Sequence, residues 1–482
     1  MPTSVSRQFS DIGTPRPPEG AKVIMRRAVV LGASMAGLLA ARVLSDHADE
    51  VLIIERDGSD VDDGPRPGAP QGSQVHALLP AGQLQLERWY PGFTEAAIAA
   101  GAVVPPPDGV RFYVEGVLRT APPVPPTGQA TTLVSTRPFL EAMVRHRTMA
   151  IGKIRLVVGR AEGLIFDGDR VTGARYVPEG ADEIVTESAD LVVDAMGRSS
   201  RLGDWLEENG WPRPPMLRMP IKLNYATALF RRDERISDVW VAVSTASADE
   251  ARGKVARIGG FHVVEGDKWI MLVSGYDDDR PTRDVEDFTR RARAHFPTPF
   301  GDIAERAEMI GEVITYHQAD SRRRDFHKLD RLPAGLVAAG DAVASFNPVY
   351  GQGMTSAALH ASCLSAYLRS GPSPDAPARA YFEQVRVVVD AAWQTSTFSD
   401  LSLPHVDGPY PPAYKLTKWI SDVVFAASMT DAAVNRRLDA VMTMRAHPNT
   451  LMRPGTVLRA LWLSAVRGVA RSRRSEVSPA AG

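Results

Sequence analysis

The apolar residues after position 26 fall into short runs that predict two buried strands with a helix between them. Residues 28–31 form an uninterrupted apolar run, which is typical of a strand covered on both faces. An apolar pattern with helical spacing continues to Leu44, and residues 51–54 form a second buried strand. Residues 1–25 include a Pro-rich stretch and many small polar residues, and we expect them to be a flexible leader.

The turn between the first strand and the helix has the pattern of a dinucleotide-binding site. Gly32 permits the tight turn, Gly37 lets the helix pack closely on the strand, and the helix N-terminus presents free N–H groups to a pyrophosphate. Glu55 ends the second strand, where an acid would accept hydrogen bonds from the adenosine ribose. Ser34 replaces the middle glycine of the usual motif, and its small side chain still fits. The residues of this turn expected to contact the cofactor are Gly32, Ser34, Met35, Ala36 and Gly37.

A second connection between a strand and a helix, far along the chain, carries a similar signal. Residues 335–339 form an apolar run that leads into Gly340 and Asp341, and a loop rich in Pro and Gly then precedes a helix from Met354. Glycine leaves its main-chain N–H open to a ligand, and a helix N-terminus favours an anion. This loop is therefore a second candidate for cofactor contact.

These residues resemble the flavoprotein aromatic hydroxylase superfamily, whose members carry a Gly-Asp pair followed by Pro-x-x-Gly-x-Gly. The resemblance implies an FAD cofactor, with Asp341 at its ribityl chain. The loop residues expected at the N1–C2=O edge of the flavin are Pro348, Gly351, Gln352 and Gly353. Reduced flavin carries negative charge at N1, and a helix N-terminus stabilises that charge.

Two further residues enter through the same resemblance. Arg137 stands at the start of a predicted helix, where family members place an arginine against the cofactor phosphates or the ribityl chain. Ala161 follows a predicted strand whose backbone commonly lies against the adenine. Both are expected cofactor contacts.

One motif of the superfamily is altered in this chain. Its Asp-Gly pair, implicated in contacts to both FAD and NAD(P)H, aligns with Met196 and Gly197, so the acid is missing. Asp194 is either a displaced equivalent of that acid or a strand-ending residue that caps a local turn. The electron donor is therefore either NAD(P)H directly or a separate flavin reductase.

Most of the chain resembles the actinobacterial branch that includes the epoxidases of polyether biosynthesis. The likeness lies in residues 70–79, 193–197 and 344–351. It implies a monooxygenase that transfers oxygen from a C4a-hydroperoxyflavin to a large hydrophobic substrate of secondary metabolism, by epoxidation or hydroxylation. It does not choose between an olefin and an aromatic ring.

The arrangement of these segments predicts an α/β fold with a Rossmann-type FAD-binding domain, an antiparallel β-sheet substrate domain and a helical C-terminal region. Residues 26–205 and 325–400 are assigned to the discontinuous FAD domain. Residues 206–324, with about 103–130, alternate between apolar and polar and predict the substrate-binding sheet. Residues 401–482 are predicted to be helical.

The sequence offers one weak catalytic candidate. The resemblance places His76 beside the flavin, where it could shield or protonate the peroxide, although a structural hydrogen bond is the preferred interpretation. Cys363 is the only cysteine and the histidines lack metal-binding spacing, so we expect no metal. Serine hydrolase chemistry is not expected because no Gly-x-Ser-x-Gly motif occurs.

Two basic segments each allow two interpretations. Residues 322–324 are three arginines that could meet a cofactor phosphate, but a solvated face is preferred. The last helix carries an apolar stripe formed by Leu458, Leu461, Trp462, Ala465, Val466 and Val469, accompanied by arginines. Such a helix can lie on an anionic membrane or bind a partner, although packing onto the FAD domain is preferred here.

Composition narrows the classes of partner and compartment. The 44% hydrophobic and 23% charged residues are those of a globular protein, and a net charge of −1 gives no reason to expect nucleic acid. Without a long apolar run or a signal-peptide core, we expect a cytoplasmic protein that binds a small molecule and O2. The alternatives are an FAD-dependent reductase or dehydrogenase acting on double bonds, and a non-catalytic flavin-binding redox sensor. A halogenase is disfavoured because Trp-x-Trp-x-Ile-Pro is absent.

Overall fold

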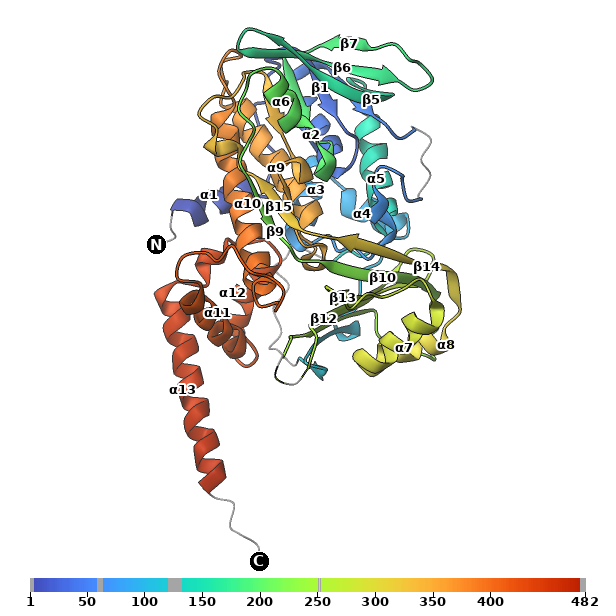
Figure 1. Ribbon diagram of the computed structural model, residues 1–482, viewed down its shortest axis with the longest axis vertical. Coiled ribbons are helices and arrows are strands. Elements are labelled where there is room, and N and C mark those ends of the chain that lie inside the picture. Colours follow the sequence, from blue (N-terminus) through green and yellow to red (C-terminus); the bar gives the residue numbers. More distant parts are fainter. Residues whose placement is uncertain (1–3, 59–63, 120–131, 250, 252, 477–482) are drawn as a thin grey trace, which may run out of the picture.

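The computed structural model describes residues 4–58, 64–119, 132–249, 251 and 253–476 and has the predicted α/β fold (Figure 1). Its upper part holds a sheet packed with helices, and its lower part holds a second sheet. A group of helices at the C-terminal end lies beside the second sheet, and the last of them points away from the body.

The first sheet carries the predicted β-α-β unit. Its order is β16-β8-β1-β2-β5-β6-β7, and the first five strands are parallel. Their bounds are β1 (Met25–Leu31), β2 (Ala48–Glu55), β5 (Ile154–Asp167), β8 (Leu191–Asp194) and β16 (Leu336–Ala338). The strands β6 (Arg170–Pro178) and β7 (Val185–Ser188) extend it in antiparallel fashion. Val29, Val30 and Leu31 are fully buried, as expected for a strand with both faces covered.

Most of the helices of this part pack on one another in a layer against the sheet (Figure 1). The main ones are α2 (Met35–Leu44), α3 (Pro80–Trp89), α4 (Phe93–Ala99), α5 (Arg137–Met149), α6 (Leu202–Glu208), α9 (Gln352–Arg369) and α10 (Arg379–Asp400). The helices α2 and α9 lie against each other although more than 300 residues separate them in sequence. The first strand and the late strand β16 therefore share one core.

The second sheet has the order β14-β10-β13-β12-β11-β3-β4. Its strands are β3 (Val110–Val114), β4 (Val117–Leu118), β10 (Leu223–Arg231), β11 (Val241–Ala246), β12 (Arg257–Val264), β13 (Lys268–Tyr276) and β14 (Met309–Gln318). All neighbours are antiparallel except β3 and β11, which run parallel. The helices α7 (Val285–His295) and α8 (Thr298–Arg306) cover one face, where Phe230, Phe261 and Phe300 are buried.

A small third sheet joins the two larger ones. It consists of β9 (Met216–Met219), β15 (Ser321–Arg324) and β17 (Ala344–Ser345). The sequence predicts solvated side chains for the three arginines at 322–324, and this prediction is wrong for two of them. Arg323 pairs with Asp325 at 2.7 Å, and Arg324 donates to the carbonyl of Ala342 at 2.9 Å, so both are buried by structural partners.

The predicted flexible leader is wrong for residues 4–12. These residues form α1 (Ser4–Ile12), and Phe9 and Ile12 are buried in the core of the first sheet and its helices. Gln85 and Arg88 of α3 donate to main-chain carbonyls at its end, at 3.2 and 3.3 Å. The polar composition of this segment concealed two apolar residues on one helical face.

The C-terminal region is helical, as α11 (Tyr414–Ser428), α12 (Ala432–Met442) and α13 (Pro454–Glu476). The preferred packing of the last helix onto the FAD domain is wrong. The buried side of α13 carries Ala460, which packs on Val424 and Ala427 of α11. Leu458 and Trp462 of the predicted stripe lie on the opposite side and are 66% and 64% exposed. Within the described residues, no helix is both long and apolar enough to cross a membrane.

The packing of α1 gives a first testable expectation. Replacing the buried Phe9 by alanine removes most of its side chain from the core and should destabilise the protein by about 3 kcal/mol. Urea denaturation of the full chain measures this change. The exposed Arg7 on the same helix is the matched control, and Arg7→Ala should leave the midpoint nearly unchanged. Equal midpoints for Phe9→Ala and the wild type would contradict the packing of α1.

Candidate functional site

The carboxyl ends of the parallel strands meet at one edge of the first sheet, where α/β proteins bind their ligands. The N–H of Gly32, directly after β1, donates to the carbonyl of Ile54 at 2.8 Å. Glu55 ends β2 and accepts a short hydrogen bond from the N–H of Ala33. Gly340 follows β16 and begins the short helix η6 (Gly340–Ala342). The two glycine-containing segments predicted from the sequence therefore lie at the same edge.

Three glycines hold these segments closer than any side chain would allow. A Cβ at Gly37 would lie 1.8 Å from the carbonyl oxygen of Gly32. A Cβ at Gly32 would lie 2.6 Å from the carbonyl oxygen of Ala195, and its φ of +102° is unfavourable for other residues. At Gly340 a Cβ would lie 2.5 Å from Cβ of Ala36. The start of α2 is thereby held against both β1 and η6.

A cluster of buried charges surrounds the N-terminus of α2. The hydroxyl of Ser34 donates to Glu141 at 2.7 Å, and Arg137 donates to the Ser34 oxygen at 3.0 Å. Arg66 donates to the same Glu141 carboxylate from its Nε at 2.8 Å and lies 3.6 Å from Glu55. Arg66, Arg137 and Glu141 line a hollow on the protein surface here, and Glu55 lies beside it.

The charges of this cluster set the state of its carboxylate. Burial alone raises the pKa of Glu141, but the guanidinium groups of Arg137 and Arg66 and the hydrogen bond from Ser34 outweigh it, so the pKa is lowered. Glu141 is therefore ionised at neutral pH. Arg137 retains a buried Nε without a hydrogen-bond partner among the described residues, so this donor remains for a ligand.

Sequence reasoning missed Arg66, Glu141 and Arg145 of this cluster. Arg137, Glu141 and Arg145 occupy successive turns of α5, and Arg145 donates to the carbonyl of Ala33 at 2.8 Å. Their spacing of four residues is visible in the sequence and marks one helical face. The position of Arg66 carried no such signal, because it lies in an irregular segment after β2.

The second glycine-containing segment presents its main chain towards the same edge. Asp341 lies in η6, and its Oδ1 is 3.9 Å from the position of a Cβ at Gly353, with nothing nearer. Burial raises the pKa of Asp341, while the charge of Arg137 lowers it most among its neighbours, so these two predicted residues are electrostatically coupled. Pro348 begins η7 (Pro348–Tyr350), and Gly351 connects it to α9 with a φ of +66°.

The buried polar atoms of this edge fit an FAD cofactor. Gln352 is 2% exposed, and its Oε1 has no hydrogen-bond partner among the described residues. The glycine contacts at positions 32 and 37 leave the N-terminus of α2 open in the manner required by a pyrophosphate. Arg137 and Asp341 would then hold the phosphates or the ribityl chain. Met35 and Ala36 begin α2 at this edge.

The structure does not bring Ala161 to this cluster. It lies on β5 opposite Tyr176 of β6, three residues beyond Val158, the partner of Glu55. Three residues of a strand span about 10 Å. Its contact with the adenine stays a prediction.

The structure supports a capping role for Asp194. Its carboxylate is fully buried and accepts hydrogen bonds from the N–H of Met196 at 3.0 Å and from the hydroxyl of Ser200 at 2.5 Å. Both bonds are local, as in a turn that follows a strand. Arg198 lies nearby and pairs with Asp320. Direct docking of NAD(P)H stays untested.

His76 lies in a segment that packs against the glycine-containing loop. Ala77 and Leu79 are the nearest neighbours of Gly351, at 3.4 and 3.5 Å from the position of a Cβ. His76 donates from Nδ1 to the carbonyl of Gln74 at 2.9 Å, and its own carbonyl accepts from His262 at 3.2 Å. Burial, followed by the charge of Arg137, lowers the pKa of His76 to about 3. A neutral ring with this tautomer favours the structural interpretation over proton donation.

A face of the second sheet lies over the same loop. Leu223, Tyr225 and Leu272 form an apolar cluster with Val75 and Val349, which belong to the segments beside Gly351. The rings of Tyr225 and Tyr316 lie 5.5 Å apart, and the charge of Arg137 acts on both. Thr227 donates to Gln74 at 2.5 Å and ties the sheet to the His76 segment. This face and the loop therefore pack together through apolar side chains and two tyrosines.

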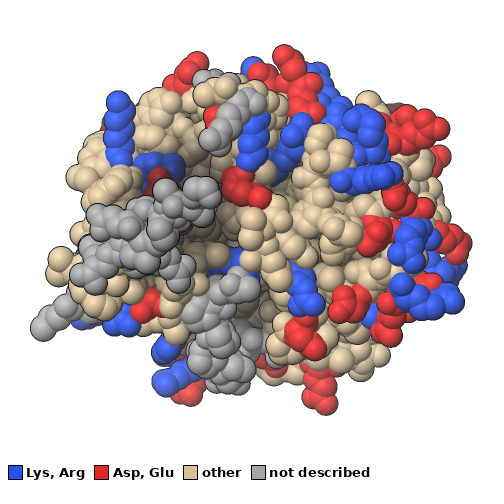
Figure 2. All heavy atoms as spheres, turned by 90° about the horizontal axis from the view of Figure 1, so that it is seen from below, with Lys and Arg blue, Asp and Glu red and all other residues tan. Residues whose placement is uncertain are grey.

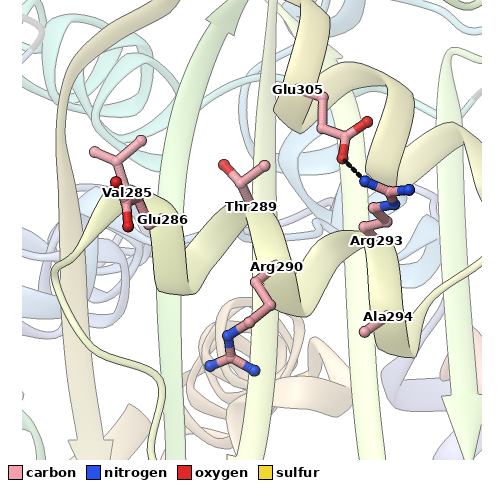
Figure 3. Close-up of a pocket in the computed structure, with 7 residues that line it drawn as sticks. All are labelled: Val285, Glu286, Thr289, Arg290, Arg293, Ala294 and Glu305. Atoms are coloured by element: carbon pink, nitrogen blue, oxygen red, sulfur yellow. Dashed lines mark hydrogen bonds and ion pairs between the residues drawn. The ribbon is translucent and has the colours of Figure 1, made fainter.

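A shallow hollow of about 560 Å³ lies elsewhere, between α7 and α8 (Figure 3). Arg293 and Glu305 form an ion pair of 3.0 Å across it. The helices α7 and α8 cover one face of the second sheet, and Leu223 and Tyr225 lie on the opposite face, towards the loop. This hollow is therefore not part of the candidate site. Figure 2 shows acidic and basic side chains interspersed over the molecule seen from below.

The close contact at Gly37 predicts the effect of adding one methyl group. Gly37→Ala would force α2 away from Gly32 and should lower the affinity for FAD more than about tenfold, with a loss of stability of about 2 kcal/mol. Titration of the apoprotein with FAD and thermal melting measure both effects. Gly152→Ala is the control, because a Cβ at Gly152 meets nothing within 4 Å. Normal FAD binding by Gly37→Ala would contradict the role of this turn.

The lowered pKa of His76 predicts a pH effect on stability. In the native protein His76 stays neutral, whereas in the unfolded chain it gains a proton below about pH 6.5. The unfolded state then binds more protons, so this group lowers the stability as the pH falls. The stability advantage of the wild type over His76→Gln should therefore shrink between pH 7.5 and 5.5, by at most about 1.4 kcal/mol per pH unit. A pH-independent difference between the melting curves would show that His76 titrates normally.

Comparison with known proteins places this architecture in a family. No family model matches the sequence. Protein Rv3254 of Mycobacterium tuberculosis is 31% identical over 419 residues, which cover 84% of this chain and 86% of the relative. Kynurenine 3-monooxygenase of Salinispora arenicola is 27% identical, over 78% of this chain and 80% of the relative.

The fold is also that of a solved flavoenzyme. The structure of the flavin-dependent brominase Bmp2 superposes with a TM-score of 0.64 at 17% identity, over 92% of this chain and 99% of the other. The fold and the relatives agree. The chain belongs to the same family as Protein Rv3254 and is an FAD-dependent monooxygenase of the flavoprotein aromatic hydroxylase superfamily.

Proposed function

We propose that this monooxygenase oxygenates a large hydrophobic substrate in the apolar region between the second sheet and the loop of residues 347–353. FAD bound at the edge of the first sheet supplies the activation of O2 and the transfer of one oxygen atom to the substrate. The observation that carries the proposal is the shared cluster of Leu223, Tyr225 and Leu272 with Val75 and Val349. An apolar chamber next to the flavin excludes water and accepts a hydrophobic molecule.

The titratable groups of this chamber support an acceptor that needs no deprotonation. Burial raises the pKa of Tyr225, and that of Tyr316 is raised for the same reason, so both hydroxyls stay protonated at neutral pH. They can donate hydrogen bonds and orient a substrate, but they cannot act as bases. With a pKa of about 3, the neutral ring of His76 is a weak base and does not take the proton of a phenol at neutral pH. This favours epoxidation of an olefin over hydroxylation of a phenol, which benefits from a base.

We infer that the residues of the first sheet edge hold the cofactor. Gly32, Ser34 and Gly37 would leave room for the pyrophosphate, while Glu55 would accept from the ribose hydroxyls. Asp341 would hold the ribityl chain, and the N–H groups of Gln352 and Gly353 would face the flavin. The expected contact through the N–H of Gly351 is wrong, because this group donates to the carbonyl of Pro348 at 3.0 Å. These assignments are supported by the glycine contacts and by the buried acceptor of Gln352.

The electron donor follows from the segment after β8. Met196 provides no acid for NAD(P)H, and Asp194 is engaged with Met196 and Ser200. We therefore propose that a separate flavin reductase supplies the electrons, with direct NAD(P)H oxidation as the alternative. The likeness to the actinobacterial epoxidase branch agrees with a secondary-metabolite substrate.

The proposal is tested by supplying the purified holoprotein with reductant and oxygen. The protein should show a yellow flavin spectrum, and it should incorporate one atom of ¹⁸O2 into a polyene or other hydrophobic olefin when NADPH and an added flavin reductase are present. NADPH or NADH alone should give slow oxygen uptake. Each arm is followed with an oxygen electrode and by mass spectrometry of the product.

Other outcomes identify the alternatives. Rapid oxidation of NADPH without a reductase would contradict our interpretation of Met196. Saturation of a double bond without O2 would assign a reductase or dehydrogenase, and bound FAD without turnover by any donor would assign a redox sensor. A colourless protein that cannot be reconstituted with FAD would contradict the proposal as a whole.

A further inference from the structure

The loop of residues 347–353 is held from behind by the last residue of α10. Oδ1 of Asp400 accepts hydrogen bonds from Nδ2 of Asn347 at 2.8 Å and from the hydroxyl of Tyr350 at 2.9 Å. Asp400 is 1% exposed and Asn347 is fully buried. One carboxylate oxygen therefore connects both ends of η7 to α10, across 50 residues of sequence.

These bonds determine where the following N–H groups point. Oδ1 of Asn347 also accepts from the N–H of Val349 at 3.2 Å, and the N–H of Gly351 donates to the carbonyl of Pro348 at 3.0 Å. Tyr350 directly precedes Gly351, the residue before α9. A displacement of Tyr350 is therefore transmitted to the main chain of residues 351–353.

Asp400 is a buried carboxylate without a compensating positive charge in the described part of the chain, which is uncommon for a purely structural contact. Among the described residues no cation pairs with it, and its Oδ2 has no hydrogen-bond partner. Burial raises its pKa to about 7, and the bonds from Asn347 and Tyr350 only partly oppose that shift. The other titratable group facing it is Tyr276 of β13, whose pKa is raised by burial and then by the Asp400 charge. A buried carboxylate without a cation costs stability, so its benefit must lie elsewhere.

We propose that Asp400 is a positioning residue, which holds residues 347–353 so that the N–H groups of Gln352 and Gly353 meet the flavin. The inference rests on the proposed contact between this loop and FAD. Donors fixed by a supporting layer of hydrogen bonds stabilise developing charge better than donors that must reorganise. Asp400 touches neither cofactor nor substrate, and acts through Asn347 and Tyr350.

Three variants of the full-length protein separate positioning from simple support. Asp400→Ala removes both hydrogen bonds and should weaken FAD binding to the apoprotein about tenfold. Tyr350→Phe removes one bond and should weaken binding about threefold. Asp400→Asn keeps an acceptor oxygen and should restore binding to within about twofold of the wild type. Fluorescence titration with FAD gives all three dissociation constants.

The reduction potential of the bound flavin distinguishes a positioning role from a purely structural one, because a general loss of stability would leave this potential unchanged. Misdirected N–H groups stabilise reduced flavin less than well-directed groups do. If Asp400→Ala weakens the binding of reduced FAD about tenfold more than the binding of oxidised FAD, the two-electron potential falls by about 30 mV. Asp400→Asn should keep the wild-type potential to within about 10 mV. The control is Glu383→Gln on the same helix, because Glu383 pairs with Arg386 at 2.9 Å and does not contact the loop.

Thermal melting of the apoproteins shows whether a variant binds FAD weakly because it is less stable or because the loop is misplaced. Since the native pKa of Asp400 lies above its unfolded value, ionisation costs stability as the pH rises through about 7, and Asp400→Asn should melt no lower than the wild type at about pH 8. Wild-type affinity and potential in both Asp400→Ala and Tyr350→Phe would overturn the inference. If Asp400→Ala does not fold, Tyr350→Phe decides alone. A wild-type apoprotein that binds no FAD would instead overturn the proposed function.

Discussion

The carbonyl oxygen of Gly32 lies where the side chain of residue 37 would begin, and the site depends on this contact. With no Cβ at Gly37, α2 approaches β1 so closely that its first N–H groups lie at the end of the strand. The same approach brings Ala36 against Gly340, so the early and late segments of the chain meet there. A larger residue at either glycine would separate the strand edge from the loop that follows β16.

The charges around α2 follow from that geometry. Placing Ser34 at the start of α2 puts its hydroxyl next to Glu141, which holds Arg66 and Arg137. A buried carboxylate is tolerated because two guanidinium groups and a hydroxyl surround it, which also keeps both arginines close to the helix end. The arginines thereby lie where the positive end of the helix already favours an anion.

The features of this site that could be predicted from the sequence are those that depend on residues close together in the chain. The β-α-β unit, Gly32 and Gly37, and the loop from Gly340 to Gly353 each carry their signal within a few residues, because turns and strand ends require particular backbone freedom. Glu141 and Ser34 are separated by 107 residues, and nothing local marks their pairing. The same holds for Asp400 and Asn347. For α13, helical periodicity correctly gave the helix but not its partner, since Ala460 rather than Trp462 lies on the buried side.

The two sides of the proposed chamber differ in charge. On the proposed cofactor side, main-chain donors and arginines would face an anionic ligand, which would compensate their charge. On the sheet side, Phe230, Phe261 and Phe300 fill the space under α7 and α8 and make the sheet a rigid cover without ionised groups in its core. Tyr225 and Tyr316 stay protonated over the loop because burial disfavours the phenolate. Reactive oxygen formed between these sides would meet few proton donors with a low pKa, which is the condition under which transfer to carbon competes with loss to water.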